Sequence, residues 1–189
     1  MARVYLIRHG KPAAAWGSDD DDPGLDEAGQ AQARAVAAWM LALPAHERPT
    51  AVAASPLRRC RETAGPLALA LGVAVEIDPA VGEIPTPAAL SHADRPAWLR
   101  AAFTGRWSQI KGDLDYDAWR RAVARAVCLR PRTAVFSHFV AINAVLSVLA
   151  GDETVIGFRP DHASVTILDL AAGALRLIAR GPEAATGVL

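Results

Sequence analysis

The feature that most constrains the fold is the alternation of short apolar segments with longer helical ones. Four segments rich in β-forming residues each fit a buried strand, at residues 4–7, 50–54, 73–77 and 133–136. Segments of helical periodicity lie between and after them, at residues 26–43, 57–71, 114–128 and 140–149. Because parallel strands need long crossover connections, this alternation predicts a mostly parallel sheet with helices on both faces.

The remaining segments complete a single-domain prediction. Residues 164–170 and 174–180 flank the sequence Ala-Ala-Gly, which is typical of a closing β-hairpin. Residues 79–113 are irregular, rich in proline and glycine, and contain one predicted short helix. A length of 189 residues is that of one domain. We therefore predict an α/β fold over residues 1–189, a three-layer αβα sandwich, with an insertion or cap at about residues 79–117.

Charge and hydropathy exclude several classes of protein. The 20 basic residues balance the 20 acidic ones, which argues against binding nucleic acid or an anionic membrane through a general electrostatic field. An apolar fraction of 52% excludes a disordered chain. The N-terminus lacks the apolar core of a signal peptide, and the longest apolar stretch, residues 134–150, is too polar for a membrane span. We expect a soluble cytoplasmic protein, whose oligomeric state is left open.

Neither cysteines nor acidic residues predict a metal site. Cys60 and Cys128 are too few for a disulfide framework, and neither has the spacing of zinc ligands. Neither is followed six residues later by an arginine, so the phosphate cradle of cysteine-based phosphatases is excluded. The four consecutive aspartates at residues 19–22 are interpreted as a solvated loop. We therefore expect no metal.

Polar residues collect directly after the predicted strands. Ligand sites in open α/β sheets lie at the carboxyl ends of the strands, so these residues are expected to share one site. Guanidinium groups bind phosphoryl oxygens, a neutral imidazole can attack phosphorus, and a carboxylic acid can protonate the departing alkoxide. Phosphoryl transfer is therefore the predicted chemistry. The candidate residues are Arg8, His9, Ser55, Arg58, Arg59, Glu83, Ser137 and His138.

Several motifs resemble those of a known family. Residues 6–10, Leu-Ile-Arg-His-Gly, resemble the Arg-His-Gly signature of the histidine phosphatase superfamily, whose best-known branch is the cofactor-dependent phosphoglycerate mutases. Residues 25–33 resemble the start of a family helix, residues 55–64 its Ser-Pro-Leu-x-Arg segment, and residues 135–138 its second-histidine strand. The four matches keep the family's order over about residues 4–146. The resemblance implies a phosphoglycerate mutase-like fold.

The resemblance also implies roles for individual residues. His9 corresponds to the nucleophile that carries the phosphoryl group as a phosphohistidine. Arg8 and Arg59 correspond to the two arginines that bind the phosphoryl oxygens, and the spacing of the motif selects Arg59 over Arg58. His138 corresponds to the second histidine, which donates a hydrogen bond to the same group. The family needs no metal, and the resemblance implies no cofactor.

Glu83 is the candidate proton donor and, later, the base that activates water. This role is well served if its apolar neighbours raise the pKa of its carboxyl toward neutrality. The sequence around it lacks the extended pattern seen in many family members, however. Three other carboxylates therefore stay open as alternatives for this role, namely Glu76, Asp78 and Asp94.

Two positions depart from the family pattern. Lys11 stands where many members have Glu or Gln, and it is a candidate for an additional phosphate contact. Phe139 follows the second histidine, where the family usually has glycine. The histidines outside the motifs are interpreted as structural, namely His46, His92 and His162.

The resemblance implies a phosphomonoester hydrolase acting on a small phosphorylated metabolite. The chain is shorter than typical members with mutase activity, which favours a hydrolase over a mutase-type phosphotransferase. A non-catalytic protein that binds a phosphorylated ligand is the other alternative, and the presence of both histidines and both arginines argues against it. Aromatic residues of the insertion either bind a ring portion of the substrate or pack the insertion onto the domain, namely Trp98, Trp107, Tyr116 and Trp119.

Overall fold

The centre of the molecule is a twisted sheet. The computed structural model describes residues 2–14, 20, 22–91 and 93–185. Within these residues the sheet has six strands in the order β3-β2-β4-β1-β5-β6. They are β1 (Ala2–Arg8), β2 (Ala51–Ala54), β3 (Val75–Ile77), β4 (Thr133–Ser137), β5 (Val165–Ala171) and β6 (Ala174–Ala179). The pairs among β1 to β4 are parallel, and β5 and β6 are antiparallel, which confirms the mostly parallel sheet and its closing hairpin.

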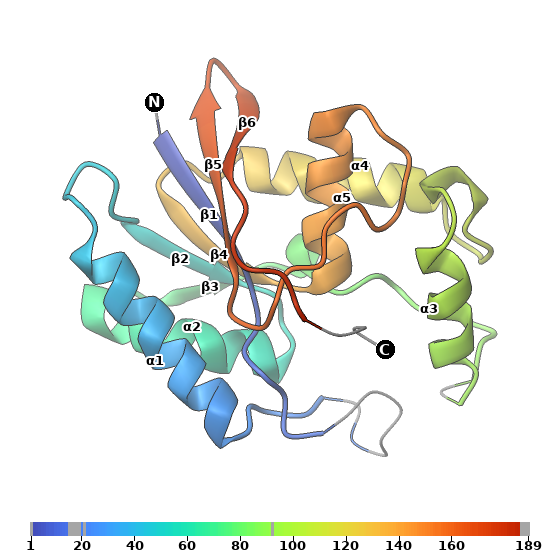
Figure 1. Ribbon diagram of the computed structural model, residues 1–189, viewed down its shortest axis with the longest axis horizontal. Coiled ribbons are helices and arrows are strands. Elements are labelled where there is room, and N and C mark those ends of the chain that lie inside the picture. The colour runs from blue at the N-terminus through green and yellow to red at the C-terminus, as the bar shows by residue number, and fades with distance from the viewer. Residues whose placement is uncertain (1, 15–19, 21, 92, 186–189) are drawn as a thin grey trace.

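Helices cover both faces of this sheet (Figure 1). One face carries α1 (Glu27–Ala42) and α2 (Arg58–Leu71), and the other carries α4 (Tyr116–Cys128) and α5 (Phe139–Ala150). Tyr5 and Ile7 of β1 belong to the core cluster on the first face, whereas Val4 and Leu6 belong to the cluster on the second. Successive side chains of a strand point to opposite faces, so one apolar strand serves both cores. The predicted three-layer αβα sandwich is confirmed.

The helix ends follow the signals in the sequence. Asp26 caps α1, where its side chain accepts a hydrogen bond from the backbone nitrogen of Gly29 at 2.7 Å. Gly72 and Gly151 end α2 and α5 in the left-handed conformation, with φ of 66° and 64°. Each of these three signals acts within a few residues, so the helix ends are predictable from the sequence alone.

Between β3 and α4 lie the short helices η1 (Pro79–Val81), α3 (Arg95–Phe103) and η2 (Trp107–Gln109). Trp107 is almost fully buried against Trp119, with ring centroids 5.8 Å apart, and Tyr116 is buried against Trp98 at 5.6 Å. These contacts favour the interpretation that the aromatic residues pack this region onto the sheet. The single domain with an insertion at about residues 79–117 stays a prediction.

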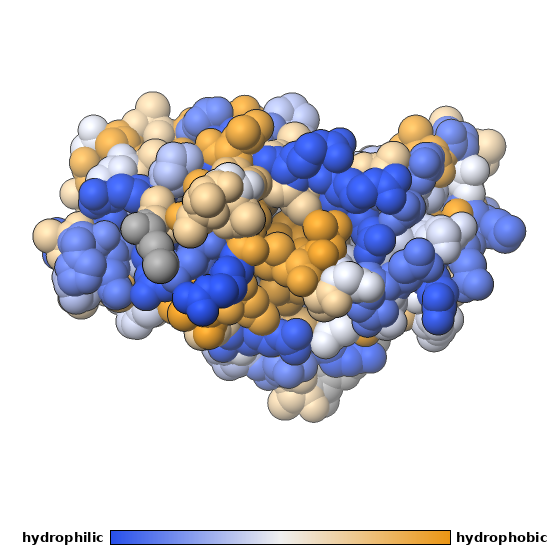
Figure 2. All heavy atoms as spheres, turned by 90° about the horizontal axis from the view of Figure 1, so that it is seen from above, coloured by the Kyte–Doolittle hydropathy of each residue, from blue (hydrophilic) through white to orange (hydrophobic). Residues whose placement is uncertain are grey.

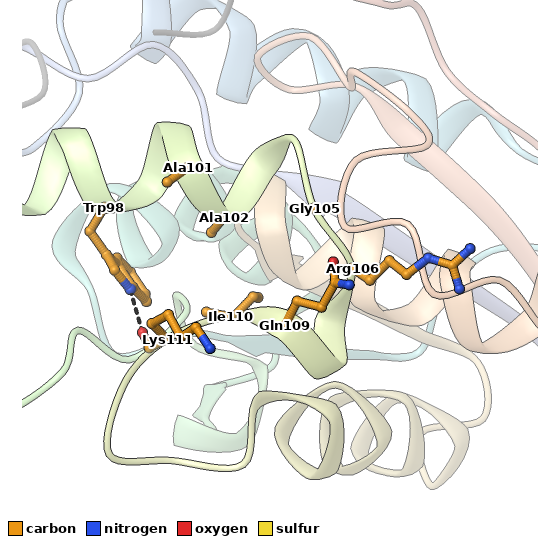
Figure 3. A pocket seen from close by; sticks show the side chains of 8 residues that line it. All are labelled: Trp98, Ala101, Ala102, Gly105, Arg106, Gln109, Ile110 and Lys111. Carbon is orange, nitrogen blue, oxygen red and sulfur yellow. Dashed lines mark hydrogen bonds between the residues drawn. The ribbon is translucent and has the colours of Figure 1, made fainter.

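Several hollows lie away from the candidate residues, among them one of about 400 Å³ between α1 and the β5–β6 hairpin. A second, of about 250 Å³, lies between α3 and η2, where Trp98 donates a hydrogen bond from Nε1 to the carbonyl oxygen of Lys111 at 2.6 Å (Figure 3). Another, of about 270 Å³, lies among α4, α5 and the β5–β6 hairpin. Seen from above, the middle of the molecule's surface is apolar and is bordered by hydrophilic residues (Figure 2). In the described part of the chain, no helix has the length and apolarity needed to cross a bilayer.

Candidate active site

The parallel strands bring the candidate residues to one edge of the sheet. The strand pairing continues one residue past the strand ends, because the backbone nitrogen of His9 donates to Ser137 O at 3.0 Å. Likewise, the backbone nitrogen of Ser55 donates to Phe136 O at 2.9 Å. The rings of His9 and His138 consequently lie 5.4 Å apart, centroid to centroid. Segments separated by more than a hundred residues thus form one cluster.

His9 is held in one protonation state. The residue is 3% exposed, and its Nδ1 lies 2.8 Å from the carbonyl oxygen of Gly10. A carbonyl can only accept, so Nδ1 carries the hydrogen and the lone pair of the neutral ring lies on Nε2. Burial, together with the charges of His138, Arg59 and Arg8, lowers the pKa of His9 well below its usual value. A neutral imidazole with a free nitrogen is the form that can act as a nucleophile.

The loop that carries His9 packs on the first turn of α1. A Cβ on Gly10 would lie 2.8 Å from Gly29 O, and a Cβ on Gly29 would meet the carbonyl oxygen of Lys11. Both positions therefore need glycine. Lys11 itself turns to the helix start, where its Nζ lies 2.8 Å from Asp26 Oδ2 and its side chain is 56% exposed. The side chain proposed for an extra phosphate contact is thus engaged by Asp26.

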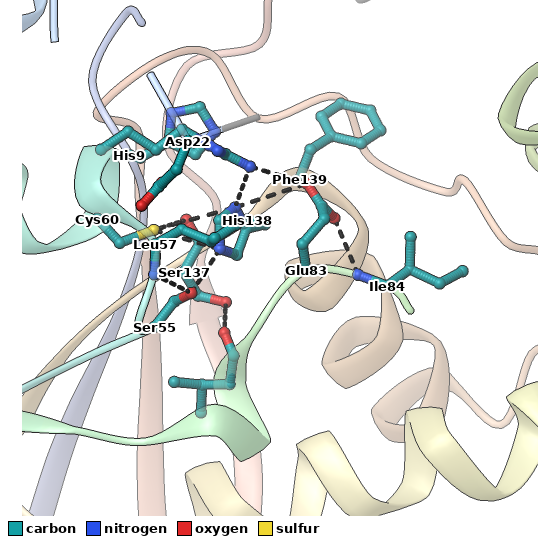
Figure 4. A network of polar contacts seen from close by, with 12 residues as sticks. His9, Asp22, Ser55, Leu57, Cys60, Glu83, Ile84, Ser137, His138 and Phe139 are labelled. Atoms are coloured by element: carbon teal, nitrogen blue, oxygen red, sulfur yellow. Dashed lines mark hydrogen bonds and ion pairs between the residues drawn. The ribbon is translucent and has the colours of Figure 1, made fainter. Parts of the chain in front are cut away.

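His138 lies at the centre of a buried polar network (Figure 4). Its Nε2 lies 2.7 Å from Ser55 Oγ, and its Nδ1 lies 3.5 Å from Glu83 Oε2 and 3.4 Å from an Arg59 nitrogen. Burial lowers the pKa of His138 to about 3, because the charge of Glu83 offsets burial and the neighbouring arginines only in part. His138 is therefore neutral at pH 7, like His9.

The structure brings Arg8 and Arg59 to this network. Arg8 is 4% exposed and donates from Nη1 to Pro160 O at 3.0 Å. Burial lowers its pKa to about 10, so it is still a cation at pH 7. The side chain of Arg59 is 11% exposed, with a nitrogen 3.7 Å from Glu83 Oε2. Arg58 is 58% exposed and pairs instead with Glu62, so the arginine selected by the motif is the one that faces inward.

Glu83 lies against His138 and Arg59, and its surroundings set the acidity of its carboxyl. Burial alone would raise the pKa of its carboxyl, yet the charges of His138, Arg59 and Arg95 together lower it below its usual value. The raised pKa that would suit a proton donor is therefore not present in this arrangement. Its sequence neighbours are apolar, but in space the arginines Arg59 and Arg95 act on it through their charge.

The three alternative carboxylates are engaged elsewhere. Glu76 accepts two hydrogen bonds from Arg130, and Asp78 accepts another from the same guanidinium at 2.7 Å. Asp94 accepts a hydrogen bond from Ser91 Oγ at 2.6 Å. Of these four carboxylates, Glu83 is the one in contact with His138.

His162, which the sequence analysis interprets as structural, lies beside the candidate site. Its ring lies 5.6 Å from that of His9, and its Nδ1 lies 3.4 Å from the backbone oxygen of His9. Burial and the charge of Arg8 lower its pKa to about 4. Because β5 is antiparallel to β1, the residues before β5, and not those after it, reach this edge. The predicted hairpin was the signal that could have directed attention to His162. Of the other two histidines interpreted as structural, His92 lies outside the described residues, and His46 is exposed.

A cysteine and an aspartate also lie near the site. Cys60 Sγ lies 3.4 Å from His138 Nε2, and burial raises the pKa of its thiol, so the reactive thiolate is disfavoured. Asp22 accepts a hydrogen bond from the backbone nitrogen of Arg58 at 2.7 Å, at the start of α2. Over the residues that the structure describes, no three His, Cys, Asp or Glu side chains form a group able to hold a metal ion.

Comparison with known families decides the classification. The model of the histidine phosphatase superfamily (branch 1) matches residues 4–181. The chain belongs to the histidine phosphatase superfamily. Membership confirms the resemblance read from the four motifs and the predicted type of enzyme, a histidine phosphatase. No curated protein matches the chain in sequence.

Solved structures of several proteins described as phosphatases share this fold. The phosphoserine phosphatase of Entamoeba histolytica, in complex with 3-phosphoglyceric acid, superposes with a TM-score of 0.74 at 18% identity, covering 96% of this chain and 98% of that one. A mycobacterial glucosyl-3-phosphoglycerate phosphatase gives 0.72 at 22% identity, covering 97% and 100%. A putative alpha-ribazole-5'-P phosphatase of Escherichia coli gives 0.71 at 18% identity, covering 97% of each chain. The predicted phosphoglycerate mutase-like fold is confirmed.

Proposed function

We propose that the protein is a phosphomonoester hydrolase that acts on a small phosphorylated metabolite through a phosphohistidine at His9. One observation carries this proposal. Two buried imidazoles with lowered pKa values and two poorly exposed guanidinium groups meet at the sheet edge, with one carboxylate beside them. The cations suit a phosphoryl dianion, and the neutral imidazole suits a nucleophile.

In the proposed first step, Arg8 and Arg59 bind the non-bridging oxygens of the phosphoryl group. Nε2 of His9 attacks phosphorus in line with the leaving oxygen, so an N–P bond forms as the P–O bond breaks. Glu83, when protonated, gives its proton to the leaving alkoxide. His138 donates a hydrogen bond to the phosphoryl oxygens, where negative charge spreads in the transition state.

In the second step, the Glu83 carboxylate takes a proton from water as that water attacks phosphorus. The N–P bond breaks, inorganic phosphate leaves, and His9 returns to its neutral form. Because the same carboxyl acts first as acid and then as base, it ends the cycle protonated as it began.

The substrate class rests on three arguments. The site is a cluster of a few buried side chains, which suits one phosphoryl group. Zero net charge disfavours a polyanionic substrate. The structural neighbours named above are phosphatases of phosphoserine, glucosyl-3-phosphoglycerate and, putatively, alpha-ribazole-5'-phosphate, all of which are small metabolites.

Hydrolysis of p-nitrophenyl phosphate and of a panel of metabolite phosphoesters tests the proposal, together with trapping of an acid-labile phosphoenzyme. We expect turnover by the wild type and a loss of at least about a thousandfold in His9→Gln. His46→Gln, which changes an exposed histidine of a distant loop, serves as the matched control.

Other outcomes would point to the alternatives. Phosphoryl transfer between phosphoglycerates with little release of phosphate would identify a mutase. Phosphate binding without turnover above that of His9→Gln, across pH 5–8, would identify a binding protein and refute the hydrolase.

A further inference from the structure

Arg8 is a buried cation that, among the residues the structure describes, has no carboxylate in ion-pair contact. It is 4% exposed, its Nη1 donates to the carbonyl oxygen of Pro160, and its Nε has no hydrogen-bond partner. Glu83 and Asp161 act on it through their charge, but among the described residues neither lies within salt-bridge distance of it. Burying such a charge is costly unless another group compensates.

Phe139 offers that compensation. The Cζ atom of Arg8 lies 5.3 Å from the centre of the Phe139 ring, and Phe139 is 2% exposed. Figure 4 shows Phe139 directly beside His138, with its ring directed away from Ser55. The face of an aromatic ring attracts a guanidinium group through its quadrupole. Unlike a carboxylate, it neither neutralises the charge nor occupies the N–H donors.

We propose that Phe139 is a positioning residue of the reaction, whose ring holds the Arg8 guanidinium in the site while its charge and donors stay available to the phosphoryl group. This inference rests on the proposed function. A carboxylate in the same place would compete with the substrate for Arg8. An aromatic ring stabilises the buried guanidinium and still leaves its charge available to a bound anion.

A second aromatic ring supports Phe139. The ring of Phe103, at the end of α3, lies 5.8 Å from that of Phe139 at an interplanar angle of 35°. The position of Arg8 therefore depends on a helix that is far from it in sequence.

A buried amide ties the two supports of Arg8 together. Asn143 donates from Nδ2 to Phe139 O at 2.9 Å, and its Oδ1 accepts from the backbone nitrogens of Gly157 and Phe158 at 3.1 and 3.0 Å. The loop held in this way runs on to Pro160, whose carbonyl binds Arg8. Hydrogen bonds of Asn143 thus connect the first turn of α5 to the loop whose Pro160 carbonyl accepts from Arg8.

The test is the affinity for inorganic phosphate, measured by calorimetry, in Phe139→Leu and Phe139→Tyr. Leucine keeps an apolar side chain but removes the ring, so we expect phosphate binding to weaken about tenfold, as loss of a desolvated cation–π contact implies. Tyrosine keeps the ring, and we expect it to bind within about threefold of the wild type. Phe103→Leu, which leaves Phe139 in place, should weaken binding less than Phe139→Leu and provides a second variant if that one fails to fold.

Phe136→Leu is the matched control, because that ring is equally buried but packs in the core on the opposite face of the sheet. It should lower the melting temperature and leave phosphate affinity unchanged. The inference is overturned if Phe139→Leu binds phosphate like the wild type, or if Phe136→Leu weakens binding equally. If the wild type shows no turnover but its phosphate affinity still falls in Phe139→Leu, the hydrolase proposal is refuted. The role of Phe139 in positioning Arg8 for anion binding is then still supported.

Discussion

At the scale of single residues, the charges of the site favour binding of an anion. The two central imidazoles are neutral, and the pKa of Glu83 is lowered against the effect of burial by the charges of neighbouring arginines, Arg59 among them. A general acid must nevertheless be protonated when the leaving group departs. A phosphoryl dianion bound by Arg8 and Arg59 would offset their charge, so we expect substrate binding to raise the pKa of Glu83.

Replacing Glu83 by glutamine tests this role. We expect the kcat for an alkyl phosphoester such as phosphoserine to fall about a hundredfold or more, because the alkoxide then leaves without a proton. The kcat for p-nitrophenyl phosphate should fall by about tenfold or less, since nitrophenolate is a stable anion. Asp94→Asn, which changes a carboxylate hydrogen-bonded to Ser91, is the control. Equal losses on the two substrates would exclude Glu83 as the proton donor.

At the scale of elements, the site depends on how the loop after β1 meets helix α1. The backbones of Gly10 and Gly29 pack closely against each other. This contact positions the loop that carries His9 relative to α1. Helix propensity alone would favour alanine over glycine at position 29, within α1. The close backbone contact at Gly29 therefore outweighs the helix propensity that would favour alanine there.

Gly29→Ala is expected to lower the free energy of unfolding by about 1–3 kcal/mol, because the new Cβ would displace the backbone of Lys11. It should also lower kcat/KM, because the displaced loop carries His9. Urea denaturation and hydrolysis assays measure the two effects. The control is Gly157→Ala, whose Cβ would meet nothing within 4 Å and which should leave stability unchanged or raise it by up to about 1 kcal/mol. A Gly29→Ala protein as stable and active as the wild type would refute the role of this contact.

At the scale of the whole molecule, the buried histidines make stability depend on pH. His9, His138 and His162 all have lowered pKa values in the folded chain, with about 3 for His138 and about 4 for His162. In the unfolded chain they take up protons below about pH 6.5. The unfolded state then binds more protons, so the free energy of unfolding falls as pH falls through this range. Glu83, whose folded pKa is lowered, adds a loss only below its unfolded value of about 4.5.

We therefore expect His9 and His138 each to reduce the free energy of unfolding by about 2 kcal/mol between pH 7.5 and pH 5. Urea denaturation across this range measures the slope, which should be shallower in His138→Gln than in the wild type. His46→Gln should keep the wild-type slope. An identical slope in His138→Gln would show that His138 is not held neutral in the folded protein.

Much of the fold and part of the site follow from local signals. The strands and helices were predictable because apolar period, capping residues such as Asp26 and terminal glycines such as Gly72 act within a few residues. The convergence of His9, Arg59 and His138 was predictable because parallel strands end at one edge of a sheet. These inferences needed sequence order and one general rule of topology.

Other properties arise between segments that are distant in sequence. His162 reaches the site because β5 runs against β1, and the pKa of Glu83 falls because the charges of Arg59 and Arg95 act on it from other elements. Phe139 meets Arg8 only once α5 has packed on the sheet. The sequence by itself thus determined the layers, the family motifs and the edge at which they meet, since these depend on short-range pattern. Only the tertiary structure decided the protonation states and the support of Arg8, because charge and ring contacts depend on distance in space.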